Sequence, residues 1–291
     1  MIRRIRLRTA LLSAGAAVLA TVGVSAAVPS AATQAVATTT VSTVAGAASA
    51  KPAEPKPTVV LVHGAWADSS GWAGVITRLT KAGYPVVAAG NPLRGLAIDT
   101  AAVKDVLRGI EGPIVLVGHS YGGAVITNAA AGDRDVKALV YVAALAPDAG
   151  ESLADLSAQP IAHPIPPAPV REVPTVAVDG TKGVDRYLAC DAFRATFAAD
   201  VDPVTAATMA LTQRPLAASA SAEKTEATAW RTIPSWYLVS TQDRVIAPDE
   251  ERYLAARAKA HTEEVHASHA VMVSRPGVVA HLIIEADHGT R

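Results

Sequence analysis

One short stretch, GHSYGG from Gly118 to Gly123, constrains the fold of this chain more than any other. It follows an apolar run from Pro113 to Val117, which is typical of a short buried strand, and precedes residues 124–131, which predict a helix. A serine flanked by glycines on a sharp turn between strand and helix is the pattern of a nucleophile elbow, G-x-S-x-G. Glycine is favoured because strand and helix meet too closely there for side chains. The turn would lift the Ser120 hydroxyl above the edge of a sheet, where a base can reach it.

The same short pattern also occurs in ordinary glycine-rich turns with a solvated serine. The rest of the chain therefore has to decide between the two interpretations. With 291 residues, half of them hydrophobic, the chain is long enough for one α/β domain with an ample core, and no internal repeat is visible.

The first residues carry the features of a secretory signal. Four arginines lie within the first eight residues, and the segment from Thr9 to Val24 is apolar and built largely of small side chains. Small residues that suit cleavage follow at positions 25–27 and 35–37. We therefore expect a signal peptide over residues 1–26, with cleavage as late as residue 37, and a secreted or extracytoplasmic location.

Two alternatives concern the same segment. Its apolar stretch is at the margin of the length of a retained membrane anchor, but the small-residue sites favour removal, so we expect no stable membrane anchor after processing. Arg3 and Arg4 resemble part of a twin-arginine signal that the neighbouring residues do not complete. Residues 27–56 are rich in Ala, Thr and Pro, which predicts a flexible lead-in to a domain over residues 57–291.

The charge balance argues against two classes of partner. The chain carries 26 basic and 26 acidic residues, and removal of the four leader arginines leaves a net charge near −4. Nothing in this balance suggests a surface for nucleic acid or for anionic membranes. The single cysteine, Cys190, cannot form an internal disulfide, and we interpret it as a small packed residue rather than a nucleophile.

Strand and helix patterns alternate on both sides of the elbow. This alternation predicts a mostly parallel sheet with right-handed crossovers and helices on both faces. Ligands of such sheets bind beyond the carboxyl ends of the strands, where the loop from His63 to Trp66 and the Ser120 turn would lie. The expected strands are 58–62, 84–88, 113–117, 136–143, 233–240 and 262–266, and the expected helices are 72–81 with Ser70 and Gly71 as caps, 100–110 with Asp99 as cap, 124–131, 203–212, 248–260 and 276–286.

The alternation breaks between residues 148 and 232. This region contains a proline-rich stretch from Pro160 to Pro174 and no clear core strand. Asp202 before Pro203 is typical of an N-cap and a first helical position, and predicts a helix to about residue 212. A structureless loop of this length is unusual inside a compact domain. We therefore expect a small, partly helical cap over the active edge of the sheet, inserted after strand 136–143.

A serine at such a turn needs two partners to act as a nucleophile. Its hydroxyl is weak at its own pKa, so a neighbouring base has to take the proton, and an acid has to orient that base. In chain order, the acid and then the histidine should follow the serine, each just after a strand. Asp243, in the segment STQDR, and His269, in ASHA, occupy those places.

Together these motifs carry a resemblance to a known family. The turn HGAW, the elbow GHSYGG and the segments STQDR and ASHA occur in the order found in α/β-hydrolase-fold serine hydrolases, which residues 57–290 resemble. Within that superfamily the chain is similar to small bacterial esterase-like proteins and, more distantly, to plant methylesterases and hydroxynitrile lyases. The resemblance implies that Ser120 is the nucleophile, His269 the general base and then acid, and Asp243 the orienting carboxylate.

The resemblance also implies an oxyanion hole and a reaction. The backbone N–H groups of Ala65 and Tyr121 would hold the oxyanion, and loss of one such donor typically costs about 3 kcal/mol of transition-state stabilisation. The implied activity is hydrolysis of small to medium carboxylic esters, with a small-molecule ester as substrate and no cofactor. The alternatives are other acyl chemistry on the same triad (thioester, amide or lactone hydrolysis, or perhydrolysis) and a non-catalytic protein of this fold that binds a small molecule.

Two departures from relatives narrow the reaction. Hydroxynitrile lyases of this fold carry a lysine directly after the catalytic histidine, whereas this chain has Ala270. Dehalogenases and epoxide hydrolases of the fold use an aspartate at the elbow, where this chain has Ser120. We therefore expect neither cyanohydrin cleavage nor those two reactions.

Other residues compete for the roles of acid and base. Asp148 and Glu151 also follow a strand, but Asp243 directly terminates one. His63 and His119 belong to their motifs and are expected to brace the two loops. No histidine shows the spacing of a metal site. The other histidines are His266 on the last strand, His163 in the proline-rich stretch, His261 at the surface, and His281 and His288 in or after the last helix.

Four apolar residues, Trp66, Phe193, Phe197 and Met209, are candidates to line an acyl or alcohol pocket under the cap. Packing in the core is the competing interpretation for each, because apolar residues at helical spacing are usually core residues. Nothing in the sequence indicates an oligomeric state.

Overall fold

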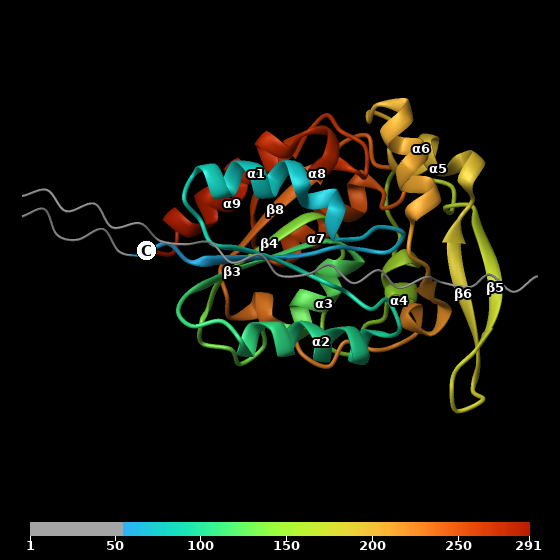
Figure 1. Ribbon diagram of the computed structural model, residues 1–291, viewed down its shortest axis with the longest axis horizontal. Coiled ribbons are helices and arrows are strands. Elements are labelled where there is room, and N and C mark those ends of the chain that lie inside the picture. Colours follow the sequence, from blue (N-terminus) through green and yellow to red (C-terminus); the bar gives the residue numbers. More distant parts are fainter. Residues whose placement is uncertain (1–54) are drawn as a thin grey trace, which may run out of the picture. The chain divides into compact units, whose positions relative to one another are not determined.

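The computed structural model describes residues 55–291 and is built around a sheet of six parallel strands (Figure 1). The predicted signal peptide, residues 1–26, and the predicted lead-in up to residue 54 lie outside the described residues. In order across the sheet, the strands are β2 (Val86–Ala89), β1 (Thr58–Val62), β3 (Ile114–Ser120), β4 (Val136–Ala144), β8 (Ser235–Ser240) and β9 (His261–Val265). The strand that ends in Ser120 therefore lies between two others in the middle of the sheet.

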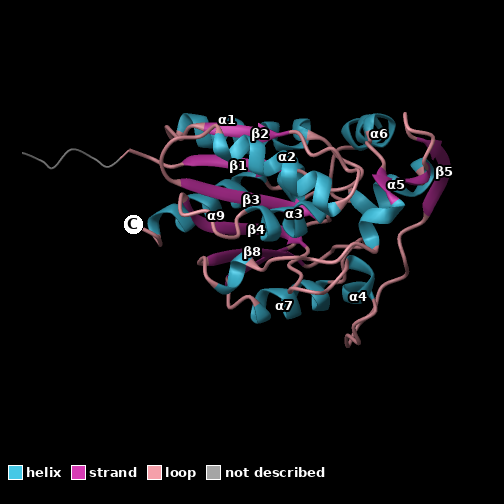
Figure 2. Ribbon diagram, turned by 90° about the horizontal axis from the view of Figure 1, so that it is seen from below, coloured by secondary structure: helices cyan, strands magenta, loops and turns pink. Residues whose placement is uncertain are grey.

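Helices cover both faces of this sheet, as the alternating pattern predicts (Figures 1 and 2). The four central strands, β1, β3, β4 and β8, are almost entirely buried on both sides. In β1, for example, Val59 and Leu61 pack toward one helix layer, and Val60 and Val62 toward the other. Among residues 55–291, no helix has the length and apolar character needed to cross a membrane. One layer holds α1 (Ala73–Lys81), α8 (Val271–Ser274) and α9 (Pro276–His288), and the other holds α2 (Leu96–Arg108), α3 (Tyr121–Ala129) and α7 (Pro248–Arg257).

The start of α2 differs from the prediction. The helix begins three residues before Asp99, so Asp99 is not its cap. Asp99 instead lies in the first turn, fully buried, and its carboxyl accepts hydrogen bonds from the Arg94 N–H at 3.0 Å and from the Tyr121 hydroxyl at 2.7 Å. Asp99, which was predicted to cap the helix, therefore connects α2 to Tyr121, the residue after Ser120.

Two further helix starts contrast with each other. At the 3-10 turn η1 (Ser69–Trp72), which leads into α1, the capping side chain is Asp68, so the prediction of Ser70 and Gly71 is wrong. At α6 (Pro203–Thr212) the prediction is confirmed, since the Asp202 carboxyl accepts hydrogen bonds from the first N–H groups of the helix.

The prediction of a helical cap over residues 148–232 is incomplete, because the segment between β4 and β8 also contains an antiparallel sheet in the order β5-β6-β7. Its long hairpin stands at the right of Figure 1. The strand β5 is largely exposed and contains Pro174, which only an edge strand tolerates, so it lacks the apolar pattern of a core strand. The elements of the cap are α4 (Leu153–Ser157), β5 (Val170–Val176), β6 (Lys182–Leu188), α5 (Cys190–Phe197), α6, β7 (Leu216–Ala217), η2 (Ala218–Ser221) and η3 (Ala229–Arg231).

Polar contacts tie this cap to loops of the core. The backbone N–H of Trp66 donates to the Arg214 carbonyl at 3.1 Å, and its indole N–H donates to the Arg186 carbonyl at 2.9 Å. Arg94 forms an ion pair with Asp185 of β6 at 2.7 Å. The cap is therefore held against the loops that follow β1 and β2, at the carboxyl edge of the sheet.

Cys190 lies at the start of α5 and is exposed, so its interpretation as a packed residue is wrong. Its Sγ lies 3.7 Å from the Ala210 carbonyl oxygen. The buried residues of α5 are Phe193 and Phe197 instead.

Candidate active site

Ser120 occupies the sharp turn between β3 and α3. Its φ is 54° and its ψ −126°, a positive-φ conformation that residues with a side chain rarely adopt. The flanking glycines are explained by close approach: a Cβ on Gly118 would lie 2.6 Å from the Gly122 carbonyl oxygen, and a Cβ on Gly122 would lie 2.6 Å from that of Val62. The elbow therefore presents Ser120 at the carboxyl edge of the sheet, 5% exposed.

The exit loop of β1, residues 63–66, lies directly against this serine. A Cβ on Gly64 would come within 2.6 Å of the Ser120 Cβ and 3.2 Å of its Oγ, so there is no room for a side chain. His63 braces the loop as expected: its Nδ1 donates to the Gly64 carbonyl at 3.0 Å, and its Nε2 accepts the Asn91 N–H at 3.1 Å. Burial lowers the pKa of His63, which suits this neutral form. The Ala65 N–H has no hydrogen-bond partner among the described residues.

The residue after the serine is anchored by its side chain. The Tyr121 hydroxyl donates to the Asp99 carboxyl, and both residues are buried. Burial raises the pKa of the Tyr121 phenol, so the hydroxyl keeps its proton and remains a donor. This contact links the first turn of α3, with the Tyr121 N–H, to α2. Sequence reasoning missed the role of Asp99 because no local pattern distinguishes it from a helix cap.

His269 and Asp243 are brought together by the loops that follow β9 and β8. The Nδ1 of His269 donates to Oδ2 of Asp243 at 2.5 Å, and both side chains are completely buried. The N–H groups of Val245 and Ile246 donate to Oδ1 of Asp243 at 2.6 and 3.0 Å and hold the carboxylate in place. Because Nδ1 carries the proton, Nε2 of a neutral His269 presents a lone pair. This atom is buried and has no hydrogen-bond partner among residues 55–291.

His119, the neighbour of Ser120, connects the elbow to the histidine loop. Its Nε2 donates to the His269 carbonyl at 2.9 Å, and the two ring centroids lie 4.6 Å apart. Burial lowers the pKa of His119, so it acts as a neutral brace. From the cap, Phe197 packs edge-on against the His269 ring at 4.8 Å between centroids. The elbow, the histidine loop and the cap therefore meet around one imidazole.

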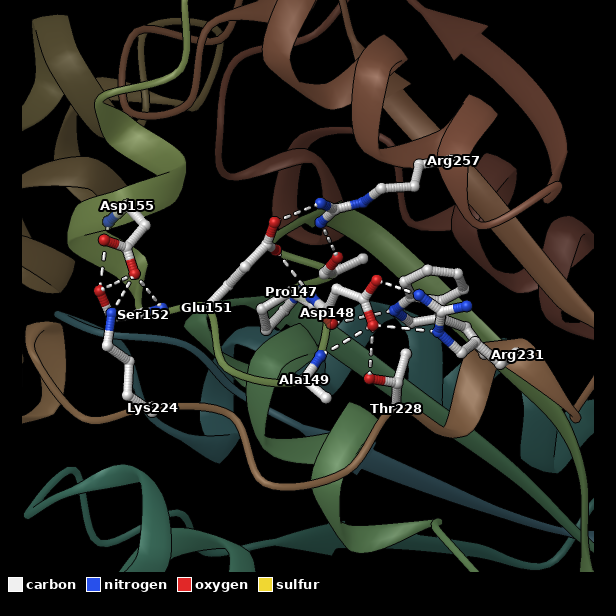
Figure 3. A network of polar contacts seen from close by, with 12 residues as sticks. Pro147, Asp148, Ala149, Glu151, Ser152, Asp155, Lys224, Thr228, Arg231 and Arg257 are labelled. Atoms are coloured by element: carbon white, nitrogen blue, oxygen red, sulfur yellow. Dashed lines mark hydrogen bonds and ion pairs between the residues drawn. The ribbon is translucent and has the colours of Figure 1, made fainter.

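The competing acids after β4 are engaged elsewhere (Figure 3). Asp148 accepts hydrogen bonds from Nε of Arg231 and from the Thr228 hydroxyl, each at 3.0 Å. The bond from Arg231 lowers the pKa of Asp148 to about 2. Glu151 forms an ion pair with Arg257 at 2.7 Å. Neither carboxyl has a histidine partner in the described part of the chain, so the geometry favours Asp243 as the acid.

The other five histidines are exposed. Three of them have contacts of their own: His163 with Asp249 at 2.7 Å, His281 with Glu285 at 3.3 Å, and His261 stacked on the Trp236 ring. Within residues 55–291, no group of three or more His, Cys, Asp or Glu side chains is arranged to hold a metal ion.

The four residues predicted to line a pocket separate into two pairs. Phe193 and Phe197 are completely buried in the cap and stack with centroids 5.0 Å apart, and Phe197 is the one that contacts His269. This arrangement favours the competing core interpretation for Phe193. Trp66 and Met209 line a cavity of about 280 Å³ between the exit loop, η1, α6 and α8. The other α6 residues of its wall are Thr205, Thr208 and Thr212.

Two known proteins are similar in sequence to this chain. A carbendazim hydrolyzing esterase of Nocardioides sp. (strain SG-4G) is 37% identical over 110 residues, which span 32% of this chain and 44% of that esterase. The alpha/beta hydrolase nvfD of Aspergillus novofumigatus (strain IBT 16806) is 27% identical over 254 residues, which span 79% of this chain and 96% of that protein.

The fold is similar to that of polyneuridine aldehyde esterase, whose crystal structure gives a TM-score of 0.67 at 17% sequence identity, over 79% of this chain and 98% of the esterase. The model of the alpha/beta hydrolase family matches residues 59–282. That range contains the elbow, the Asp243–His269 pair and the cap. The chain therefore belongs to the alpha/beta hydrolase family.

Proposed function

We propose that this protein is a serine hydrolase that cleaves carboxylic esters of small to medium size. The observation that carries the proposal is the hydrogen bond from His269 Nδ1 to Asp243 Oδ2, which leaves the lone pair of His269 Nε2 available as a base. His119, next to Ser120, donates a hydrogen bond to the His269 carbonyl and so connects the histidine loop to the elbow. Similarity to a carbendazim hydrolyzing esterase and the shared fold of polyneuridine aldehyde esterase support ester hydrolysis. The chemistry needs no cofactor.

In the first half of the reaction, Ser120 attacks the ester carbonyl carbon while His269 Nε2 takes the hydroxyl proton. Asp243 keeps His269 in the required tautomer and balances the positive charge that forms on it. The N–H groups of Ala65 and Tyr121 donate to the oxyanion of the tetrahedral intermediate. When this intermediate collapses, the alcohol leaves with the proton held by His269, and the acyl group stays on Ser120.

In the second half, a water molecule takes the place of the alcohol. His269 removes a proton from this water, which attacks the acyl carbonyl carbon, and the same N–H donors hold the new oxyanion. Collapse returns the proton to Ser120 and releases the carboxylic acid. Charge develops at the same atoms in both halves, so one set of donors serves both.

The burial of the site limits what it can accept. Ser120 is 5% exposed and His269 is completely buried, so the reaction is screened from bulk water, which strengthens the electrostatic contacts. The cavity of about 280 Å³ beside Trp66 adjoins the exit loop and suits an apolar acyl or alcohol group of modest size. The small volume supports a preference for small to medium esters.

Hydrolysis of p-nitrophenyl acetate, butyrate and octanoate by the protein and by Ser120→Ala tests the proposal. We expect the variant to lose about 10³-fold or more of kcat/KM while its circular dichroism spectrum stays unchanged. Labelling with a fluorophosphonate probe, followed by mass spectrometry, should modify Ser120 alone. A protein that neither hydrolyses the esters nor reacts with the probe would contradict the proposal and favour a ligand-binding role.

We also propose that the protein is exported and that residues 1–26 are removed. The support is the arginine-rich start followed by the apolar segment from Thr9 to Val24. Expression of the full chain in a bacterial host, followed by fractionation and N-terminal sequencing, tests this. A mature protein that begins between residues 27 and 38 is expected outside the cytoplasm, whereas an intact N-terminus in the cytoplasm would contradict it.

A further inference from the structure

A second buried carboxyl lies beside Asp243 and has no part in the reaction above. Glu251, near the start of α7, is completely buried. Its Oε2 accepts a hydrogen bond at 3.1 Å from the N–H of Ser240, the last residue of β8. The Ser240 carbonyl in turn accepts the Asp243 N–H at 3.0 Å. The Glu251 carboxyl is therefore anchored to the same turn that carries Asp243.

The other carboxyl oxygen of Glu251, Oε1, is buried and lacks a hydrogen-bond donor among the described residues. The side chain of Asp243 lies within hydrogen-bonding reach of this carboxyl, but an ionised aspartate is itself only an acceptor. Two carboxylates cannot hydrogen-bond to each other unless one of them holds a proton. A proton on Glu251 would supply the missing donor.

Asp243 has room for this additional hydrogen bond. A carboxylate accepts about four hydrogen bonds, two at each oxygen. Its Oδ1 already accepts the N–H groups of Val245 and Ile246, and its Oδ2 accepts Nδ1–H of His269. One position remains open at Oδ2, the atom that His269 contacts. A donor at that position would add a fourth hydrogen bond to the three that already hold the Asp243 carboxylate.

The surrounding charges also favour a neutral Glu251. The charged groups that act on it are the carboxyls of Asp243 and Glu250, while Tyr237 of β8 is a buried, uncharged phenol. Burial first, and then the negative charge of Asp243, raise the pKa of Glu251 well above its usual range. Of two adjacent buried carboxyls, one keeps its proton, because both cannot ionise together.

We propose that Glu251 is a positioning residue of the triad, which in its protonated form donates a hydrogen bond to Asp243 while it accepts one from Ser240. The pair then holds Asp243 in the orientation that His269 requires. This inference rests on the proposed function, because Glu251 acts on the reaction only through Asp243.

Three variants separate this role from a merely structural one. Glu251→Gln keeps the shape, the acceptor for Ser240 and a donor for Asp243, whereas Glu251→Leu removes both hydrogen bonds at similar volume. Glu250→Gln is the matched control, because it removes the neighbouring carboxyl and leaves both bonds of Glu251 intact. The readouts are kcat and KM with a p-nitrophenyl ester and the rate of Ser120 phosphonylation by a fluorophosphonate, each across pH.

We expect the glutamine variant and the Glu250→Gln control to stay within about threefold of the wild-type kcat at pH 7. The leucine variant should lose about 10- to 100-fold in kcat and in phosphonylation rate, with KM within about twofold, because it misplaces the triad without touching the ester. At alkaline pH the wild-type protein should lose activity as Glu251 ionises. The glutamine variant should keep its activity there, because a carboxamide donates at every pH.

Stability gives a readout that does not depend on catalysis. Folded Glu251 holds its proton more tightly than the unfolded chain does, so its contribution is complete at acid pH and is lost as pH rises above 4.5 toward the folded pKa. The free energy of unfolding of the glutamine variant, measured in urea, should therefore exceed that of the wild type by a margin that grows with pH. Parallel stability curves would contradict a protonated Glu251.

Equal losses of kcat in the glutamine and leucine variants would overturn the proposal, because an ionised Glu251 would then be the active form. A leucine variant with wild-type kcat and pH profile would overturn it as well. If the leucine variant does not fold, coincident alkaline profiles of the wild type and the glutamine variant are the result that overturns it. Failure of the proposed function is a different result: Ser120 of the wild-type protein would then not react with the probe.

Discussion

Two loops at the carboxyl edge of the sheet carry acidic residues, one after β4 and one after β8, and these acidic residues have different partners. The β4 loop carries Asp148 and Glu151, each paired with an arginine (Figure 3). The β8 loop carries Asp243, which is buried against His269 and has a second carboxyl, Glu251, beside it. Asp148, Glu151 and Asp243 all follow a strand, so their position does not distinguish them. The residue that each one contacts does: an arginine partner suits a carboxyl that holds the cap, and a histidine partner suits one that orients a base.

The electrostatic contrast follows from these partners. The hydrogen bond from Arg231 stabilises the charged form of Asp148 and lowers its pKa to about 2. Near Asp243, burial without a cation raises the pKa of Glu251 above its usual range. In the β4 loop each carboxylate is neutralised by an arginine. In the β8 loop a buried carboxylate faces His269 and, in the proposed reaction, would stabilise a positive charge on that imidazole.

The largest effect expected from this comparison is on catalysis. Asp243→Asn should lower kcat/KM for p-nitrophenyl butyrate by about 10³- to 10⁴-fold, because an amide can donate to Nδ1 of His269 and leave the proton on Nε2. Asp148→Asn should stay within about threefold of the wild type. Similar losses in the two variants would remove the distinction between the loops.

A second experiment tests whether Asp148 can replace Asp243 when its arginine partner is removed. Arg231→Ala in the Asp243→Asn background frees Asp148 from its partner without giving it a histidine. We expect no recovery of kcat/KM, because the described contacts of the Asp148 carboxyl are with Arg231, Thr228 and the Ala149 N–H, and none is with a histidine. A recovery of tenfold or more would show that the β4 loop can supply the acid.

An intermediate effect is expected on stability. Arg257→Gln removes the ion pair with Glu151 and a hydrogen bond to the Ala146 carbonyl. Because the side chains of Arg257 and Glu151 are only 16% and 24% exposed, this change should lower the free energy of unfolding by about 1–2 kcal/mol. Arg231→Gln, at a side chain that is 60% exposed, should lower it by clearly less, because solvent screens the ion pair with Asp148. Urea denaturation at pH 7 measures both, and the reverse order would contradict this account.

The smallest effect is the pH dependence of the β4 loop. Because the folded pKa of Asp148 is lowered from 3.8 to about 2, its contribution to stability is complete above pH 3.8 and is lost as pH falls toward 2. Asp148→Asn should therefore be less stable than the wild type at pH 5, and the difference should shrink between pH 3.8 and 2. A constant difference over that range would mean that the charge of Asp148 contributes nothing.

Much of the fold was predictable because its signals are local. The apolar run before GHSYGG, the strand at 58–62 and the N-cap at Asp202 each depend on residues within a few positions of one another. The antiparallel sheet of the cap was not predictable in this way. Its strand β5 is exposed and takes its partner β6 through a hairpin, without the buried pattern that marks a core strand.

Short local patterns were enough to predict the parallel sheet, the elbow with Ser120, and the two later strand ends after which Asp243 and His269 lie, because such patterns specify turns and strands. Which carboxyl contacts the histidine depends on the packed fold, since the partners that occupy Asp148 lie about 80 residues away in the chain. It alone paired Tyr121 with Asp99 and brought Glu251 beside Asp243. Such contacts depend on which buried groups face each other once the layers pack, and no local pattern carries that information.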